Sequence, residues 1–151
     1  MKVLIVYDSV YGNTEKIARA IGEAVAPSNE VKVLRVGEAN PTELSSANLL
    51  MVGSPTHAGR PVQGVQDFLK RVPDLSLKGV NVAAFDTRIS KKVVGLFGYA
   101  SGRIADSLKK KGGTLIGSPE GFFVTGGEGP LKEGELERAA SWAKGILQAK
   151  K

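Results

Sequence analysis

Apolar positions along the chain gather into short runs whose length and composition suit β-strands. Most of these runs are continuous, which is typical of strands buried on both faces of a parallel sheet. One run instead alternates apolar and polar residues and predicts a strand near a sheet edge. The pattern predicts five strands, the second alternating and the fifth in two pieces: Lys2–Tyr7, Val31–Val36, Asn48–Gly53, Val80–Phe85, and Thr114–Gly117 with Phe122–Val124.

Between these runs, apolar residues recur at spacings of three and four, as on one face of an amphipathic helix. Such patterns begin at Ile17, Val62, Ile104 and about Leu131. The last pattern has glutamates near its start and lysines near its end, which agrees with the helix dipole. Strands that alternate with helices predict a single doubly wound, five-stranded parallel α/β sheet, with right-handed crossovers and helices on both faces.

In such a sheet, ligands bind beyond the carboxyl ends of the strands, where the strand order reverses. This rule selects three loops, Asp8–Asn13, Ser54–Pro61 and Asp86–Gly102, all rich in Ser, Thr, Gly, Asn or Arg. The third is long for a strand-to-helix connection, where roughly two to six residues are usual. We expect a binding site where these loops meet.

The first loop has the chemistry of an anion site. A strand, a tight loop and a helix in direct succession aim free backbone N–H groups and the positive helix end at an anion, usually a phosphate. Ser9 and Thr14 offer hydroxyls, Asn13 an amide, and Gly12 lets the chain approach closely. A nucleotide-hydrolysing loop would place a Lys before the Ser/Thr, and this loop has none. The alternative is a plain turn in which Asn13 and Thr14 only cap the helix.

Composition narrows the class of protein. The 151 residues, 42% of them hydrophobic, fit one domain with a substantial core. The absence of cysteine excludes disulfides, thiolate metal sites and a Cys nucleophile. The chain opens on a strand-like run without a signal segment and has no apolar run of membrane-spanning length. We therefore expect a cytoplasmic protein without a membrane partner.

The net charge of +6 raises the question of nucleic-acid binding. Lys and Arg are spread along the chain, however, without interleaved aromatic residues or a recognised motif, so no nucleic-acid partner is expected. The densest run, Lys109–Lys111, is followed by Gly112 and Gly113. We interpret it as a helix end, where cations complement the dipole and glycine supplies a cap.

Several motifs of the chain resemble those of one protein family. Ser9-Val10-Tyr11-Gly12-Asn13-Thr14 resembles the phosphate loop of flavodoxins, a Ser/Thr-x-x-Gly-x-Thr pattern between the first strand and first helix. Gly53–Gly59 resembles the second flavin loop, especially that of the flavodoxin domains of flavodiiron proteins. The resemblance continues through Phe85–Arg88 and Phe122–Leu131, and so covers essentially the whole chain. It implies a single flavodoxin-like domain over residues 1–151, strand order 2-1-3-4-5, and FMN as cofactor.

Carried over residue by residue, the resemblance implies a complete set of FMN contacts. The phosphate would be held by Ser9, Val10, Tyr11, Gly12, Asn13 and Thr14. One wall of the isoalloxazine ring would come from Ser54, Pro55, Thr56, His57, Ala58 and Gly59. Further contacts would come from the third loop, through Asp86, Thr87, Arg88 and Tyr99. No residue is expected to be catalytic, and no metal site is expected.

The chain departs from the usual family pattern at the ring end. Many flavodoxins place a Trp in the second loop, where this chain has His57, which either contacts the flavin or stays exposed without chemistry. We interpret Trp142, the sole tryptophan, as a packing residue of the last helix. Flavodoxins also carry a stacking aromatic, often Tyr, in the third loop. The candidates here are Phe97, which suits the core equally well, and Tyr99, which we favour.

Charge near the expected site is also unusual, because flavodoxin surfaces are usually acidic. The loops here carry five cations, opposed only by Asp86: Arg60, Arg88, Lys91, Lys92 and Arg103. Cations beside a flavin stabilise its anionic reduced form. The hypothesis is a less negative reduction potential than in acidic flavodoxins.

The resemblance implies an FMN-binding protein that shuttles electrons between redox partner proteins, which we expect to present acidic docking surfaces to this basic chain. One alternative is an FMN-dependent NAD(P)H:quinone or flavin oxidoreductase of the same fold. Another is a flavin-free phosphate-binding or signalling module. A phosphoacceptor receiver domain would need an Asp at the third strand end, where this chain has Gly53 and Ser54.

Overall fold

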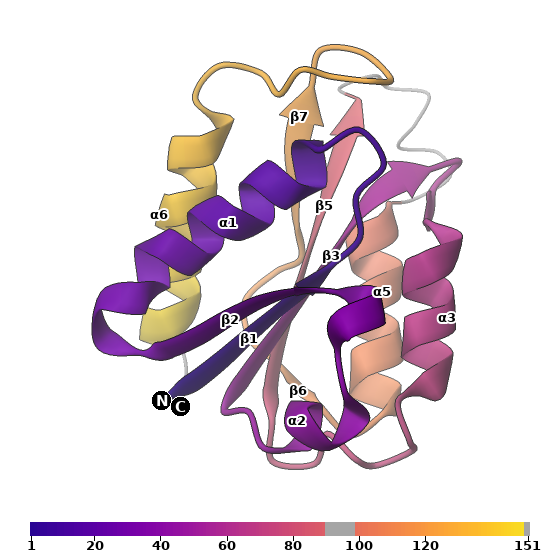
Figure 1. Cartoon of the computed structure of the whole chain (residues 1–151), viewed down its shortest axis with the longest axis vertical. Helices are drawn as coiled ribbons and strands as arrows, with labels where there is room; N and C mark the ends of the chain where they lie inside the picture. Colours follow the sequence, from indigo (N-terminus) through magenta and orange to yellow (C-terminus); the bar gives the residue numbers. More distant parts are fainter. Residues whose placement is uncertain (90–98, 150–151) are drawn as a thin grey trace.

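The computed structural model describes residues 1–89 and 99–149 of the chain, and its centre is a parallel sheet (Figure 1). The parallel strands are β1 (Lys2–Tyr7), β2 (Glu30–Arg35), β3 (Leu49–His57), β5 (Asn81–Ile89), β6 (Thr114–Leu115) and β7 (Glu120–Val124). The two short strands β6 and β7 both pair with β5 in parallel. The order β2-β1-β3-β5-β6, with β7 also on β5, confirms the expected order and the divided last strand.

The sheet is not purely parallel, which corrects the five-strand expectation. A two-residue strand, β4 (Arg60–Pro61), runs antiparallel to β3 and pairs His57 with Arg60. The chain reverses through Ala58 and Gly59, both in the left-handed region with φ of 52° and 77°. Positive φ at both central residues suits a two-residue hairpin turn. Alanine rarely occupies this region, so the sequence pattern gave no indication of the hairpin.

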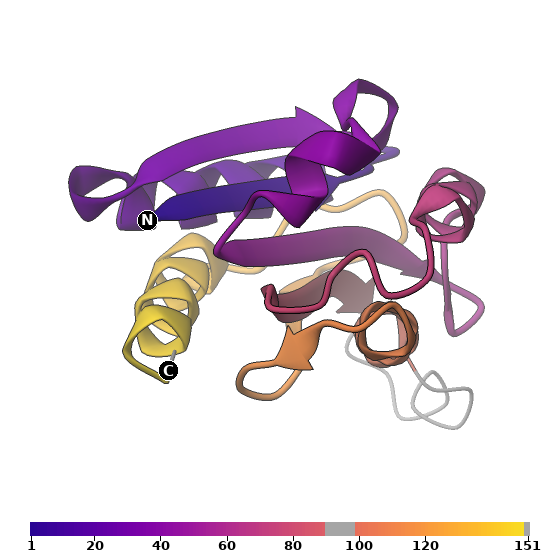
Figure 2. The same ribbon diagram turned by 90° about the horizontal axis from the view of Figure 1, so that it is seen from below.

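Helices cover both faces of the sheet, as expected (Figures 1 and 2). On one face α1 (Asn13–Val25) lies beside α6 (Glu135–Ala149), and on the other α3 (Gln63–Arg71) lies beside α5 (Ala100–Lys110). The short helices were not predicted, because they are too brief to show a period: α2 (Pro41–Ser45), η1 (Ala26–Ser28) and η2 (Val36–Glu38).

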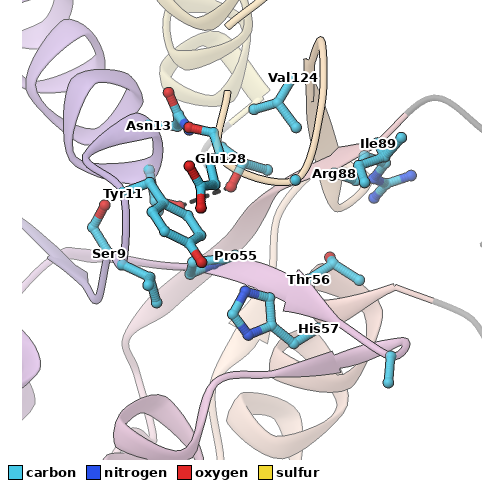
Figure 3. Close-up of a pocket in the computed structure, with 15 residues that line it drawn as sticks. Ser9, Tyr11, Asn13, Pro55, Thr56, His57, Arg88, Ile89, Val124 and Glu128 are labelled. Carbon is cyan, nitrogen blue, oxygen red and sulfur yellow. Dashed lines mark hydrogen bonds between the residues drawn. The ribbon is translucent and has the colours of Figure 1, made fainter. Parts of the chain in front are cut away.

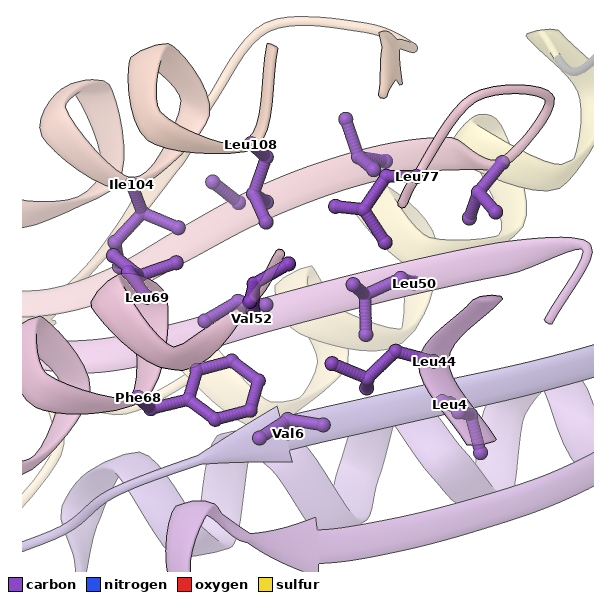
Figure 4. Packing of buried hydrophobic residues seen from close by; sticks show 14 of the residues in the cluster. Leu4, Val6, Leu44, Leu50, Val52, Phe68, Leu69, Leu77, Ile104 and Leu108 are labelled. Atoms are coloured by element: carbon purple, nitrogen blue, oxygen red, sulfur yellow. The ribbon is translucent and has the colours of Figure 1, made fainter. Parts of the chain in front are cut away.

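Two hydrophobic clusters hold these layers together, one on each face of the sheet. Because side chains alternate along a strand, Leu4 and Val6 of β1 join the cluster under α3 and α5, while Val3 and Ile5 join the cluster under α1 and α6. Figure 4 shows the first cluster, where Phe68 of α3 and other apolar side chains pack onto the central strands. Both faces of the sheet are therefore buried against helices, as its continuous apolar runs predict.

The predicted end of α5 is confirmed, whereas the predicted start of α6 is wrong. The cap after Lys109–Lys111 is confirmed, since α5 ends at Lys110 and Gly112 has a φ of 101°. The last helix, however, begins at Glu135 rather than near Leu131. Leu131 instead forms a β-bridge with Val124, and Gly134 just before the helix has a φ of 87°.

Trp142 is a packing residue, as its position in the last helix indicated. Its indole lies edge-on to the rings of Phe85 and Phe122, with centroids 6.1 Å apart in both cases. It therefore joins α6 to β5 and β7. Among the described residues, no helix has the length and apolar character needed to cross a membrane.

Close packing at Gly53 gives a first prediction. A Cβ at Gly53 would overlap the buried ring of Phe85 on the neighbouring strand. Gly53→Ala is expected to lower the free energy of unfolding by about 1–3 kcal/mol, measured by urea denaturation. Gly37→Ala is the control, because a Cβ there meets nothing within 4 Å. Equal stability of the two variants would contradict the packing.

A second prediction concerns pH and the start of α6. The buried carboxylate of Glu135 accepts bonds from Arg138 Nη2 at 2.7 Å and from the Phe123 amide at 2.6 Å. The hydrogen bond from Arg138 is the main reason that the pKa of Glu135 is lowered. A lowered folded-state pKa gives stability that is present above the unfolded-state pKa and is lost as the pH falls.

Glu135→Gln is therefore expected to destabilise the protein at pH 7 by about 1.5–3 kcal/mol, the range for hydrogen bonds to charged groups. The difference from the parent protein should shrink once the pH falls below the unfolded-state pKa of about 4.3. Urea unfolding between pH 7 and pH 3 measures it, with the exposed Glu133→Gln as the matched control. A difference that does not change with pH would refute the role of this ion pair.

Candidate functional site

A pocket of about 410 Å³ lies beyond the carboxyl ends of β1, β3 and β5 (Figure 3). The three segments selected by the strand-end rule all contribute to it, together with the segment after β7. Its lining residues are Ser9, Val10, Tyr11, Asn13, Thr14, Pro55, Thr56, His57, Ala58, Thr87, Arg88, Ile89, Val124, Gly127 and Glu128.

The loop between β1 and α1 presents hydrogen-bond donors to the pocket. Gly12, with a φ of 90°, turns the chain into the helix. Ser9 Oγ accepts bonds from the amides of Gly12 at 3.1 Å and Glu15 at 3.4 Å, which leaves its hydroxyl hydrogen free to donate. Within the described part of the chain, the amides of Tyr11, Asn13 and Thr14 have no acceptor. Donors without acceptors at a helix N-terminus form an anion site.

Two acidic groups near this loop, Asp8 and Glu15, are paired with arginines. Arg35 Nη1 lies 3.3 Å from Asp8 Oδ1, and its Nη2 lies 3.2 Å from Glu15 Oε1. Glu15 also accepts a hydrogen bond from Arg19, which is the main reason that its pKa is lowered. Because both carboxylates are paired with arginines, they oppose an anion in the loop only weakly.

The loop after β7 closes the pocket on one side. Asn13 Nδ2 donates to the backbone oxygen of Glu128 at 3.1 Å, and a Cβ at Gly129 would collide with the Asn13 amide. Four lining residues were missed by the site prediction: Ile89, Val124, Gly127 and Glu128. The strand-end rule applied to the fifth strand would have found the segment after Val124, because its carboxyl end lies at the same sheet edge.

The second segment is a strand for most of its length, which corrects its assignment as a loop. β3 continues through His57, and Pro55, Thr56, His57 and Ala58 line the pocket. Ser54 does not, because its buried Oγ donates to the Pro55 oxygen at 2.8 Å and accepts from the Val62 amide at 3.0 Å. That side chain holds the connection into α3 in place.

Gly59 does not line the pocket either, and neither does Gly12. The Gly59 oxygen accepts a bond from Arg103 Nε at 2.9 Å, which ties the hairpin turn to α5. Both glycines shape the backbone around the pocket rather than its wall.

The start of the third segment, residues 86–89, also lies in a strand, since β5 extends through Ile89. Thr87 and Arg88 line the pocket, and Thr87 Oγ1 lies 2.8 Å from Thr14 Oγ1 in a buried hydrogen bond. Asp86 is fully buried beneath them and does not reach the pocket. It accepts bonds from Arg88 Nε and Nη2, both at 2.7 Å, and from the Ser101 amide at 2.9 Å.

Tyr99 is covered by Arg88 and does not line the pocket. The guanidinium carbon of Arg88 lies 3.4 Å from the centroid of the Tyr99 ring. The same guanidinium donates to Ser101 Oγ at 3.2 Å. Asp86 and Tyr99 therefore fix the orientation of Arg88, which is the residue of this group that faces the pocket. The other aromatic candidate, Phe97, lies outside the described residues.

Five cations were expected near the site, and among the described residues one of them, Arg88, lines the pocket. Arg88 lines the pocket, and its charge is compensated by Asp86. Arg60 and Arg103 line a different hollow. Lys91 and Lys92 lie outside the described residues. The less negative reduction potential stays a prediction, and Arg88 alone among the described cations faces the pocket that would carry it.

In the described ranges 1–89 and 99–149, no three His, Cys, Asp or Glu side chains gather as a metal site would require. The pocket thus combines an anion site, apolar surface and one fixed guanidinium. A doubly wound α/β sheet with these features at its switch point defines a protein that binds an anionic organic ligand.

Comparison with known proteins identifies the family. A family model described as flavodoxin matches residues 5–142, so the chain belongs to the flavodoxin family. Members of this family bind FMN as their cofactor. A flavodoxin from Clostridium saccharobutylicum is 26% identical over 147 residues, which cover 92% of this chain and 91% of that protein.

Other curated relatives match over shorter stretches: the aligned segments cover only 15%, 32% and 20% of three of them. Among solved structures, an archaeal flavodoxin has a TM-score of 0.82 at 24% identity, over 98% of this chain and 97% of that one. The rubredoxin oxygen:oxidoreductase of Desulfovibrio gigas has a TM-score of 0.77 at 24% identity, over 98% of this chain and 35% of that one. At these identities the likeness shows the fold.

The buried pair beside the pocket gives a third prediction. Asp86→Asn leaves the Arg88 side chain, only 14% exposed, without its counter-charge. The free energy of unfolding is expected to fall by about 3–5 kcal/mol, the cost of breaking a buried ion pair. Denaturation with urea measures it, and Asp106→Asn, at a side chain 69% exposed, is the control.

The double variant Asp86→Asn/Arg88→Gln separates the pair from the site as a whole. Removal of both charges should restore part of the stability lost in Asp86→Asn, because no uncompensated charge is left buried. If the double variant loses as much unfolding free energy as the two single variants lose together, or more, the two charges do not act as a pair.

Proposed function

We propose that this chain binds FMN in the pocket at the carboxyl ends of β1, β3 and β5, and carries electrons between redox partner proteins. The observation that carries the proposal is the set of amides without acceptors, Tyr11, Asn13 and Thr14, at one end of an apolar pocket. Family membership supports FMN as the ligand.

The donor set fits a phosphate monoester. Three amides, the Ser9 and Thr14 hydroxyls and the N-terminus of α1 supply neutral donors for a dianion. No Lys or Arg from this loop takes part, so the affinity for the phosphate depends on geometry more than on net charge. Gly12 allows the close approach of the backbone that this geometry requires.

The other end of the pocket fits a flat, largely apolar ring. Val10 and Tyr11 line it and are 52% and 54% exposed, which is unusual for large hydrophobic side chains. In Figure 3 the side chains of Tyr11 and His57 are directed toward each other across the pocket. A bound aromatic ring would bury this surface and be positioned by it. His57 and Ala58 stand where many flavodoxins place a Trp.

When bound, FMN supplies the redox chemistry, while the protein positions it and controls access. Among the described lining residues, Arg88 is the fixed cation and His57 the one imidazole. The proposed role needs neither as an acid or a base. Arg88, held by Asp86 and Tyr99, is suited to orient a carbonyl or anionic edge of the ligand.

The net charge of +6 supports redox partners with acidic docking surfaces. Association with such partners would weaken as salt is added, because exposed charges are screened over about 10 Å at 0.1 M ionic strength.

Two measurements test the function. FMN titrated into the apoprotein should lose its fluorescence at one equivalent. The loaded protein should then not oxidise NADH or NADPH without a separate reductase. Absence of FMN binding at micromolar protein would refute the proposal, and rapid NAD(P)H oxidation by the protein alone would replace the carrier with a self-sufficient oxidoreductase.

A fourth prediction tests the phosphate end specifically. Thr14→Val keeps the shape of a side chain that is 1% exposed but removes its hydroxyl. FMN affinity should fall roughly tenfold or more, since hydrogen bonds to charged groups contribute about 1.5–3 kcal/mol. Affinity for riboflavin, which lacks the phosphate, should stay within about twofold.

Thr42→Val is the matched control, at an exposed threonine of α2 far from the pocket. It should leave both affinities unchanged. If Thr14→Val weakens riboflavin and FMN equally, the hydroxyl supports the pocket as a whole and does not hold the phosphate.

A further inference from the structure

A second pocket, of about 300 Å³, is lined by β4, whereas the pocket described above is lined by β3. It is formed between β4, α3 and α5, the two helices that lie side by side in Figure 1. Its lining residues are Arg60, Pro61, Gln66, Leu69, Lys70, Arg103, Ser107, Lys110 and Lys111. Five of the nine are cations and none is an acid.

The spacing of residues along α3 and α5 places their cations on the helix faces that line this pocket. Arg103, Ser107 and Lys110 follow each other at intervals of four and three on α5, and so share a face. On α3, Gln66 and Lys70 are four residues apart and face them across the pocket. Two hydrogen bonds join the hairpin to both helices, from Gln66 Nε2 to the Pro61 oxygen and from Arg103 Nε to the Gly59 oxygen. The walls are therefore fixed relative to one another.

The helix dipole does not account for this gathering of charge. It explains Lys70 and Lys110, which lie in the last turns of α3 and α5. It opposes Arg103, which lies in the first half of α5, and it does not bear on Arg60 in β4. Cations from three separate elements thus converge on a single concave surface.

Three of these five cations have no acidic partner among the described residues. Lys111 pairs with Asp74 at 3.1 Å, but Arg60, Lys70 and Lys110 make no salt bridge within the described ranges. Like charges that share a concavity repel one another, and an anion bound between them relieves that repulsion. Between the cations, Pro61 and Leu69 supply an apolar wall, and both residues are largely buried.

We propose that this second pocket binds a small organic phosphate, with its phosphate groups between Lys70 and Lys110 and its less polar part against Pro61 and Leu69. The volume is at the lower end of the roughly 300–1,000 Å³ typical of small-molecule sites, which favours a compact ligand over a protein surface. A concave site rich in lysine also differs from the core of a protein interface, where lysine is depleted.

The site is independent of the FMN-type pocket in its residues, since the two share none. They border the same hairpin, however, with Ala58 in the first pocket and Arg60 in the second. A ligand in the second pocket would therefore contact β4, which pairs with β3, and β3 lines the first pocket.

Titration of FMN-loaded protein with ADP, and separately with pyrophosphate, tests the proposal. Calorimetry is expected to show one ADP bound with a dissociation constant on the order of 10–100 µM at low salt. Backbone amide NMR of the same sample should show shifts at Lys70, Ser107 and Lys110. The ADP affinity should exceed that for pyrophosphate, because pyrophosphate lacks the part that would contact Pro61 and Leu69.

Two double variants that remove the same number of charges distinguish binding in the pocket from attraction by the overall positive charge. Lys70→Gln/Lys110→Gln is expected to weaken ADP binding roughly tenfold or more. Lys16→Gln/Lys144→Gln removes the same charge from exposed positions on α1 and α6, and should change affinity by less than about twofold. Both variants alter exposed lysines and should fold normally.

Several results would overturn the proposal. One is no binding of ADP or pyrophosphate below about 1 mM. Another is an equal loss of affinity in the two variants, which would indicate unspecific attraction. NMR shifts confined to Ser9–Thr14 would place the anion in the first pocket. Binding of hexaglutamate at α3 and α5 without binding of either phosphate would replace the small ligand with an acidic peptide.

Discussion

Parallel pairing of β1, β3 and β5 is the constraint on which the rest of the structure depends. It brings the carboxyl ends of three strands to one edge of the sheet, although Tyr7 and His57 are 50 positions apart in the sequence and His57 and Ile89 are 32 apart. Because both faces of the sheet are sealed by helices, that edge is where backbone donors such as the Thr14 amide stay accessible.

The same edge shows how this chain departs from the usual flavodoxin pattern. Buried Asp86 orients Arg88, and the Arg88 guanidinium stacks on Tyr99, so that Arg88 lines the pocket and Tyr99 does not. The pair is nearly neutral as a unit, and the positive charge of the molecule lies elsewhere. Part of it converges beside the hairpin, where Arg60 and Arg103 line the second pocket.

Periodicity was sufficient to predict the order and type of the long elements, because each has to bury one or both faces in a fixed repeat. It predicted the divided strand beside β5 and the cap after Lys110, since these depend on neighbours in sequence. It could not predict the β3–β4 hairpin, whose turn contains Ala58 with a positive φ. It also ended β3 and β5 too early, because Ser54 and Asp86 are polar side chains buried by partners that are distant in sequence.

The sequence by itself determined the fold class, the loop at the N-terminus of α1 and the family, since these follow from local spacing and a short motif. The tertiary structure decided which residues of those motifs face the pocket and which support it. Thr87 and Arg88 face it, whereas Ser54, Asp86 and Tyr99 hold their neighbours in place. The physical reason is that a polar side chain is directed by its hydrogen-bond partners, and those partners come from other strands and helices.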